Sequence, residues 1–168
     1  MSGRGTRALD VVRAAGVPHA VYECESPGPA SARGRERRPH YGADAVGALG
    51  LDPARVFKTL ITEVDGRLVA AVVPVAGKLD LKSFAAALGG RRASLADPAE
   101  AERATGYVVG GISPIGGRRR LPTALDASAA AFTTIFVSGG RRGLQLEIAP
   151  ADLARLTGAC TAPIRRRA

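Results

Sequence analysis

The feature that most constrains the fold is a pair of apolar segments joined by the dipeptide Asp65-Gly66. Residues 57–64 (FKTLITEV) and 67–75 (RLVAAVVPV) are rich in β-branched side chains, which favour extended backbone. A type I′ turn prefers Asp-Gly, because both of its central residues need a positive φ. The sequence therefore predicts a β-hairpin over residues 57–75, around which the rest of the chain must pack.

Short helices and further strands are expected on both sides of this hairpin, without a regular strand–helix rhythm or an internal repeat. The 168 residues suit one domain, and a hydrophobic fraction of 46% is enough for a core. We therefore expect an α/β (mixed α+β) fold, a single domain in which short helices surround one twisted, mixed, partly barrel-like β-sheet. The expected helices cover 7–16 (after the N-cap Thr6), 43–51, 80–90, 97–106 and 150–158, and the further strands 19–24, 107–110, 132–137 and 144–148.

The chain is expected to divide into a disordered N-terminus (1–5), the domain itself (6–160) and a basic C-terminal tail (161–168). Residues 25–42 combine Pro, Gly, Ser and Arg without periodicity, which predicts a long loop of the kind that is often functional or mobile. The sequence has neither an apolar run long enough to span a membrane nor the start of a signal peptide. We expect a soluble cytoplasmic protein.

The net charge of +9 points to a polyanionic partner, with RNA or DNA as the first candidate. The alternative is that a general preference for arginine made the surface basic. Clustering favours the first interpretation, because the arginines occur in runs that mostly adjoin Gly, Pro or a chain end. These runs lie within residues 33–38, 91–92, 118–120, 141–142 and 165–167.

Lysine is rare in this arginine-rich chain and occurs only as Lys58, Lys78 and Lys82. Lys58 stands inside the first hairpin strand, where an apolar side chain is expected. It is either an edge-strand lysine that reaches water or a functional amine in a cleft. Lysine differs from arginine as a compact charge on a flexible stem, so its presence there indicates that shape matters as well as charge.

Two glycine-rich segments, residues 108–117 (VVGGISPIGG) and 138–143 (SGGRRG), are candidates for ligand contact. Paired glycines such as Gly110 and Gly111 let backbone N–H groups approach an oxyanion or a phosphate closely. Ordinary turns would have the same composition, and Ser138 is either a hydrogen-bond donor in a site or the start of such a turn. Neither segment matches a nucleophile elbow or a Walker loop.

The usual catalytic sets are missing from the sequence. His19 and His40 are the only histidines, and Cys24 and Cys160 make neither a disulfide framework nor a zinc site. We expect no metal and no cofactor. An enzyme of this composition would hold its substrate with backbone N–H groups, a lysine and hydroxyls, which is electrostatic and positional catalysis.

Several stretches resemble the YbaK/EbsC family, and the resemblance covers residues 6–157. They are VFKTL, VAAVVPVAGKLDLK, ADPAEAERATGYVVGGISPIGGRRRLPTALD and TIFVSGGRRGLQLEIAPADL. The run TGYVVGGISPIG together with SGGRRGL is the most specific part.

This resemblance implies a trans-editing aminoacyl-tRNA deacylase that clears Cys-tRNA(Pro), related to the editing insertion domain of some prolyl-tRNA synthetases. A hydrolytic second sieve is needed because a small synthetase pocket cannot strongly reject a near isostere. The family's mechanism is thought to use the thiol of the substrate, which attacks the ester and leaves as a cyclic thiolactone. The implied partners are tRNA and prolyl-tRNA synthetase.

The resemblance also implies functional residues. The essential lysine of the family falls on Lys58, and the pocket glycine whose N–H faces the scissile carbonyl falls on Gly110; these are the expected catalytic residues. The expected substrate-binding residues are Tyr22, Tyr41, Thr59, Gly111, Ser138 and Gln145.

Two departures from the family pattern bear on specificity. Gln145 stands where the family usually has Asp, and a neutral amide keeps a hydrogen bond but supplies no negative charge. The loop 25–42 is longer and more basic than its counterparts, which indicates either a tRNA contact or a tolerated insertion. Alternatives to Cys-tRNA(Pro) deacylation are an Ala-tRNA(Pro)-type or other aminoacyl-tRNA deacylase, and a non-catalytic tRNA- or synthetase-binding module.

Overall fold

The computed structural model describes residues 5–24 and 41–166, and its strands form two sheets. The larger sheet has the order β4-β2-β3-β5-β8, and the smaller one has the order β1-β7-β6. The strands are β1 (His19–Glu23), β2 (Phe57–Val64), β3 (Arg67–Pro74), β4 (Ala93–Leu95), β5 (Thr123–Asp126), β6 (Ile135–Ser138), β7 (Leu144–Ile148) and β8 (Cys160–Ala162).

Five α-helices and one 3₁₀ helix are found in the described residues. They are α1 (Arg7–Ala15), α2 (Tyr41–Leu49), α3 (Leu81–Ala87), α4 (Pro98–Thr105), α5 (Pro150–Thr157) and the 3₁₀ helix η1 (Ala127–Ala131). Several begin at the capping residues that the sequence predicts. The Thr6 hydroxyl accepts a hydrogen bond from the Leu9 N–H, and the carboxylates of Asp80 and Asp97 cap α3 and α4.

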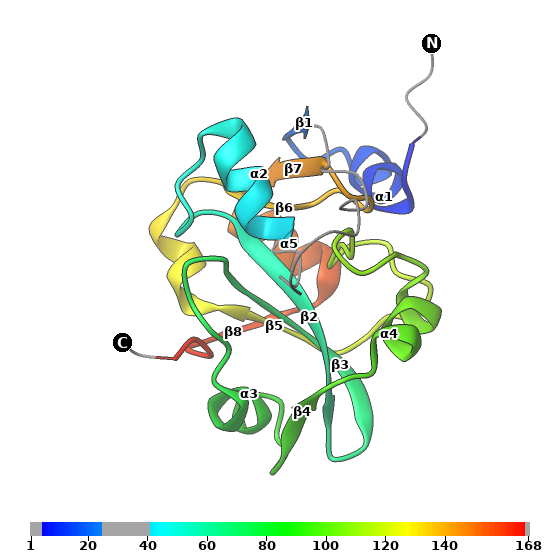
Figure 1. Ribbon diagram of the computed structural model, residues 1–168, viewed down its shortest axis with the longest axis vertical. Helices are drawn as coiled ribbons and strands as arrows, with labels where there is room; N and C mark the ends of the chain where they lie inside the picture. Colours follow the sequence, from blue (N-terminus) through cyan, green and yellow to red (C-terminus); the bar gives the residue numbers. More distant parts are fainter. Residues whose placement is uncertain (1–4, 25–40, 167–168) are drawn as a thin grey trace, which may run out of the picture.

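The hairpin of β2 and β3 crosses the middle of the molecule (Figure 1). The smaller sheet and α1 lie at one end of it, whereas α3 and β4 lie at the other. Both turn residues have positive φ, +49° at Asp65 and +81° at Gly66, as a type I′ turn requires. The predicted hairpin is confirmed, and its strands are antiparallel from Phe57–Pro74 to Val64–Arg67.

The larger sheet separates two apolar clusters, because successive side chains of a strand point to opposite faces. Phe57 and Ile61 of β2 belong to the first cluster, which also contains the buried face of β7. Val64 and Leu60 belong to the second, together with Phe84 of α3. We refer to the two sides as the first-cluster face and the second-cluster face.

The two sheets meet at one parallel bridge, between Val56 and Phe136. The Phe136 N–H donates to the Arg55 carbonyl at 3.0 Å. The mixed α/β class is therefore confirmed. The sequence suggested a single, partly barrel-like sheet, whereas the described strands form two sheets that are not closed into a barrel. This junction leaves room for a cavity beside β2.

Residues 107–110 were expected as a strand, and this expectation is wrong. The Val109 N–H donates to the Glu102 carboxylate at 2.9 Å, and the Tyr107 hydroxyl donates to the Ile115 carbonyl at 2.7 Å. These contacts hold the segment as a turn. Conversely, the short strands β4, β5 and β8 were not predicted.

Three expectations fall wholly or partly on undescribed residues. The N-terminus 1–5 is described only at its last residue, and the loop 25–42 only from Tyr41. Tyr41 is described as the first residue of α2, without its side chain. The expected basic tail starts within β8, and residues 167–168 lie outside the described part.

Candidate active site

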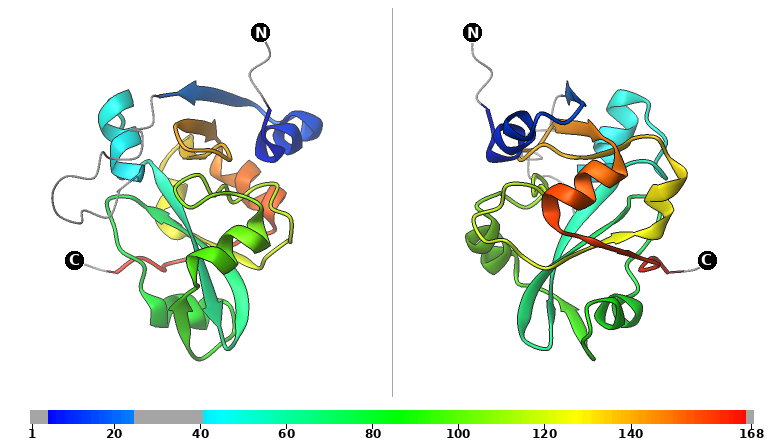
Figure 2. Two further views of the ribbon diagram at one scale, coloured as in Figure 1. Left: turned by 45° about the vertical axis from the view of Figure 1, so that its right-hand side comes forward. Right: turned by 180° about the vertical axis from the view of Figure 1, so that it is seen from behind.

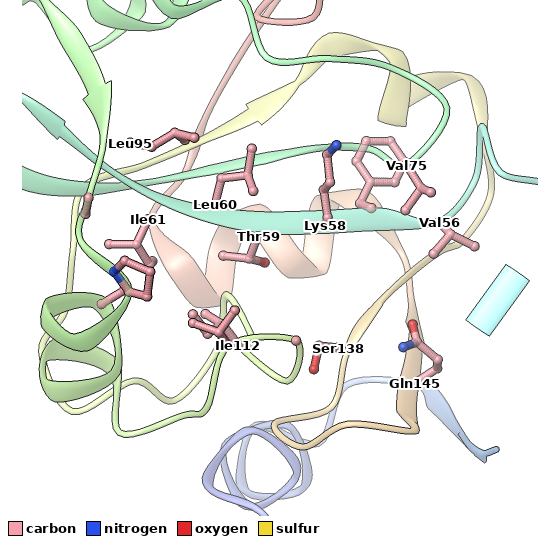
Figure 3. Close-up of a pocket in the computed structure, with 16 residues that line it drawn as sticks. Val56, Lys58, Thr59, Leu60, Ile61, Val75, Leu95, Ile112, Ser138 and Gln145 are labelled. Atoms are coloured by element: carbon pink, nitrogen blue, oxygen red, sulfur yellow. The ribbon is translucent and has the colours of Figure 1, made fainter. Parts of the chain in front are cut away.

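A cavity of about 440 Å³ opens beside β2, where the two sheets meet. Residues of β2, β6, β7, α4 and the turn after α4 line it, and Figure 3 shows these residues in close-up. The lining residues are Val56, Phe57, Lys58, Thr59, Leu60, Ile61, Val75, Leu95, Ala96, Pro98, Ala101, Val109, Gly110, Ile112, Ser138 and Gln145. The volume is within the range of small-ligand sites.

The backbone of Thr59 faces this cavity. Along an antiparallel ladder, every second pair of opposite residues is hydrogen-bonded. The Val75 N–H donates to the Val56 carbonyl, so the next hydrogen-bonded pair with β3 is that of Lys58. The N–H and C=O of Thr59 therefore point away from β3, toward the opposite edge of β2. At that edge β4 pairs only with Thr62, Glu63 and Val64. The Thr59 backbone thus remains unpaired within the described chain.

Lys58 and Thr59 project on opposite sides of β2, as Figure 3 shows. Thr59 points toward Ile112 and Ser138, whereas Lys58 points to the side of Leu60. Lys58 is half-buried, and this burial, followed by the positive charge of Lys78, lowers the pKa of its ammonium. Lys58 therefore lines the cavity from the second-cluster face of the sheet rather than beside the glycine turn.

Gly110 occupies the third position of a tight turn whose closing bond runs from the Gly111 N–H to the Val108 carbonyl at 2.8 Å. Its φ of +91° is what position three of a type II turn requires. The Val109 carbonyl accepts a bond from the Arg142 guanidinium at 3.0 Å, which helps to fix the turn. The Gly110 N–H has no acceptor among the described residues, so it is available to a ligand.

Gly111 is buried where two glycine-rich turns touch, and it does not belong to the cavity lining. A Cβ at this position would lie 2.7 Å from the carbonyl carbon of Arg141 and from the backbone nitrogen of Arg142. The missing side chain therefore permits the close approach of the 108–111 and 139–143 segments, which positions Gly110.

Ser138, Gln145 and Tyr22 form one row across the smaller sheet. Gln145 of β7 lies opposite Ser138 on β6 and opposite Tyr22 on β1. Ser138 and Gln145 line the cavity, whereas Tyr22 does not. Its hydroxyl donates to the Glu147 carboxylate at 3.1 Å, and this bond raises the pKa of Tyr22.

Two buried polar atoms of the cavity residues lack hydrogen-bond partners within the described chain, the Thr59 hydroxyl oxygen and Gln145 Oε1. Buried polar groups are normally satisfied, so such atoms call for an explanation. A ligand that supplies a donor to each would provide one.

Sequence reasoning missed the apolar wall that faces Thr59. This wall consists of Ile112 and of residues at the start of α4. Leu95, at the end of β4, is 62% exposed and lines the cavity from the other side of β2, the side of Leu60 (Figure 3). The position of Leu95 could not be anticipated because β4 has only three residues. Among the described residues that line the cavity there is no Asp, Glu, His or Cys.

Sequence reasoning also missed the ion pair of Arg55 and Glu147, 2.7 Å apart, beside the junction of the sheets. The Arg55 guanidinium lies 4.8 Å from the Phe136 ring centroid and donates to the Thr134 carbonyl. Hydrogen bonding from the Thr134 hydroxyl, more than the charge of Arg55, lowers the pKa of Glu147 despite partial burial.

No group of three or more His, Cys, Asp or Glu side chains suited to a metal ion is found in residues 5–24 and 41–166. Among the same residues, no helix is both long and apolar enough to cross a membrane.

Comparison with solved structures shows the same fold elsewhere. One is "Crystal structure of a putative trans-editing enzyme for prolyl tRNA synthetase", with a TM-score of 0.79, 25% identity and 99% of both chains covered. Another is "hypothetical protein APE2540", with a TM-score of 0.81 and 25% identity, covering 96% of this chain and 100% of the other.

Sequence comparison gives a family and two curated relatives. Over 155 residues the chain is 36% identical to "Putative Cys-tRNA(Pro)/Cys-tRNA(Cys) deacylase EbsC" of Enterococcus faecalis, covering 90% of this chain and 88% of the relative. Over 68 residues it is 41% identical to a proline–tRNA ligase of Moorella thermoacetica, covering 40% of this chain and 12% of the ligase. The model of the aminoacyl-tRNA editing domain matches residues 40–156. The chain therefore belongs to the family of aminoacyl-tRNA editing domains.

Proposed function

We propose that this protein is a trans-editing aminoacyl-tRNA deacylase that clears Cys-tRNA(Pro). The observation that carries the proposal is the Gly110 N–H, which has no acceptor in the described part of the chain and lies at the wall of a small, largely apolar cavity. Such a donor can stabilise the negative charge that develops on an ester carbonyl oxygen during acyl transfer. The deacylase relative of Enterococcus faecalis supports the substrate class.

The composition of the cavity suits a reaction in which the substrate supplies its own nucleophile. Cys24 and Cys160 are free thiols, but neither lines the cavity, and among residues 5–24 and 41–166 no histidine lines it as a base for Ser138 or Thr59. In the proposed step the thiol sulfur of the substrate bonds to its own carbonyl carbon, and the bond to the ribose oxygen breaks. The thiol proton passes to solvent and the ribose oxygen takes one up, so that tRNA and a cyclic thiolactone leave.

Four of the lining residues then have positional roles. The Gly110 N–H binds the carbonyl oxygen, while the Thr59 hydroxyl and Gln145 Oε1 accept hydrogen bonds from the bound aminoacyl ribose. Lys58 is directed away from Thr59 (Figure 3), so we assign its ammonium to a phosphate of the tRNA 3′ end. Holding the ester in a near-attack geometry supplies the catalysis.

A panel of charged tRNAs tests this proposal. Cys-, Ala-, Ser- and Pro-tRNA(Pro), and Cys-tRNA(Cys), are incubated with the protein, with and without prolyl-tRNA synthetase, and the remaining ester is followed over time. We expect rapid loss of Cys-tRNA(Pro) alone among the four proline tRNAs. Ser-tRNA(Pro) is the matched control, because it replaces the sulfur by oxygen and leaves the shape nearly unchanged.

Two outcomes would replace the proposal with a different function. Efficient hydrolysis of Ala-tRNA(Pro) with little action on Cys-tRNA(Pro) would indicate the other substrate class. Binding of tRNA without any change in the half-life of the ester would indicate a non-catalytic binding module. An effect of the synthetase on the rate would support prolyl-tRNA synthetase as a partner.

A further inference from the structure

The last described residues of the chain are fixed against the turn that follows β3. The Arg166 N–H donates to the Lys78 carbonyl, and the Asp80 N–H donates to the Ile164 carbonyl, each at 2.7 Å. An antiparallel bridge joins Leu79 to Arg165 between them. In Figures 1 and 2 the chain after β8 correspondingly runs beside the segment between β3 and α3.

Buried groups hold this segment from the inside. Asp126 Oδ1 accepts hydrogen bonds from the backbone N–H groups of Ile164 and Arg165, at 2.9 and 3.0 Å. The Ile164 side chain is fully buried in the second cluster. A Cβ at Gly77 would overlap the Cγ and Cδ of Arg165, so the Arg165 stem lies directly across Gly77. The segment thus has a defined place in the fold.

This arrangement brings positive charges together around residues 77–80. Lys58 lies opposite Val73 in the hairpin, on the second-cluster face that Ile164 also covers. Lys78 follows that strand closely enough for its charge to act on Lys58. The side chains of Lys78, Arg165 and Arg166 are exposed.

Few acids offset these charges. No described residue that lines the cavity is acidic, and Asp126 is buried and already accepts three backbone N–H groups. The Asp80 carboxylate accepts the Ser83 N–H, and the charge of Arg166 also acts on it. We refer to Lys58, Lys78, Arg165 and Arg166 as the basic track.

We propose that the basic track binds successive phosphates of the single-stranded 3′ end of a tRNA and leads that end to the cavity. The inference rests on the proposed function for the identity of the RNA, because the track ends at Lys58 on the cavity wall. A polyanion relieves the repulsion between neighbouring cations, and the planar guanidinium of arginine matches the geometry of a phosphate. An acidic protein surface is the competing occupant, which the experiment separates.

The test uses side-chain changes that preserve the backbone hydrogen bonds. The variants are Lys78→Gln and the double change Arg165→Gln/Arg166→Gln in the full chain. Arg67→Gln is the matched control, because Arg67 is exposed at the far end of the same hairpin. Arg67 lies opposite Val64, which is six residues from Lys58 along β2. Circular dichroism melting shows that each variant is folded.

Binding of uncharged tRNA is measured against salt concentration, so that the result is independent of any deacylation. We expect the double variant to bind about tenfold more weakly at 0.1 M salt. The slope of the logarithm of the binding constant against the logarithm of the salt concentration should become less steep by about 1.4, because each phosphate contact with a single strand contributes about 0.7. Lys78→Gln should lower the slope by about 0.7. Arg67→Gln should leave both quantities unchanged.

Kinetics give a second measurement. For Cys-tRNA(Pro), the double variant should raise KM about tenfold and change kcat less than twofold, as expected for a residue that binds remote phosphates. An unchanged salt slope overturns the proposal, even if the enzyme deacylates as expected. A raised KM that appears only when prolyl-tRNA synthetase is present, with normal binding of free tRNA, also overturns it and favours the acidic protein surface.

Discussion

Arg55 and Glu147 form an ion pair, with 2.7 Å between Nη2 and Oε2, that links the turn before β2 to β7 of the smaller sheet. The same carboxylate accepts hydrogen bonds from the hydroxyls of Tyr22 and Thr134. One side chain of β7 therefore contacts β1 and the segments just before β6 and β2. The cavity lies where these segments meet, so the shape of the site depends on this link.

Glu147→Gln should lower the free energy of unfolding by about 1 kcal/mol, because partly exposed ion pairs and single hydrogen bonds contribute on that scale. The pKa of Glu147 is lowered in the folded state, so its contribution is present above the pKa of the unfolded chain and disappears as the pH falls through the folded value. Urea unfolding at pH 7 and at pH 3 should therefore show a smaller difference between wild type and variant at pH 3. An equal difference at both would contradict this.

Lys58→Ala should abolish deacylation without unfolding the protein, since the ammonium is half-buried and is not paired with an acid in the described chain. Lys58→Arg should rescue only weakly, because a planar guanidinium needs more room than an ammonium. Single-turnover hydrolysis of Cys-tRNA(Pro) and thermal melting give the two measurements. Full activity of Lys58→Arg would show that only charge matters at this position.

Binding of uncharged tRNA should weaken at alkaline pH before ordinary lysines lose their charge. Burial, and then Lys78, lower the pKa of Lys58, so the folded protein releases this proton below the usual pH for lysine. At a pH between the lowered pKa of the folded protein and the ordinary pKa of the unfolded chain, Lys58 is protonated more fully in the unfolded chain. The contribution of Lys58 to the free energy of unfolding therefore rises with pH in this window. A binding titration of wild type and Lys58→Gln from pH 7 to 10 should show the early decline in wild type only.

Gly110→Ala should impair deacylation, whereas Gly111→Ala should impair the stability of the fold. At Gly110 the φ of +91° strains any L side chain, so the turn should rearrange and deacylation should fall at least tenfold. At Gly111 a Cβ meets backbone atoms at 2.7 Å, and such overpacking should lower stability by about 1–3 kcal/mol. Gly47→Ala is the control, because it lies in α2 with open space around it. Activity and urea midpoints of all three variants separate the two effects.

Thr59→Val should preserve or raise the stability of the protein by up to about 1 kcal/mol, because it removes a buried hydroxyl that lacks a partner within residues 5–24 and 41–166. If that hydroxyl binds the aminoacyl ribose, KM for Cys-tRNA(Pro) should rise severalfold in the same variant. Thermal melting and steady-state kinetics on one preparation provide both numbers. Reduced stability with unchanged KM would assign Thr59 to the fold alone.

Local chemistry made much of the fold predictable. The hairpin follows from alternation and from Asp65-Gly66, and helices α1, α3 and α4 begin beside the capping residues that the sequence indicates. The missed strands, β4, β5 and β8, have only three or four residues. Their pairing partners lie far away in the chain, so no short window of sequence contains the reason for their extension.

The candidate site was predictable in part. Lys58, Thr59, Gly110, Ser138 and Gln145 do line one cavity, although their roles stay predictions. Tyr22 and Gly111 do not line it. The Tyr22 hydroxyl donates to Glu147, two residues along β7 from its register partner Gln145, and close backbone packing occupies the surroundings of Gly111. Such facts depend on three-dimensional contacts that residue types and spacing do not contain.

The interruption in the pairing of β2 at Thr59 has a consequence for detecting occupancy. An amide proton that no carbonyl protects exchanges quickly with deuterium, and a guest that bonds to it slows that exchange. Hydrogen–deuterium exchange at this one amide should therefore report whether the cavity is filled, independently of turnover, and would serve as a reporter in screens for ligands.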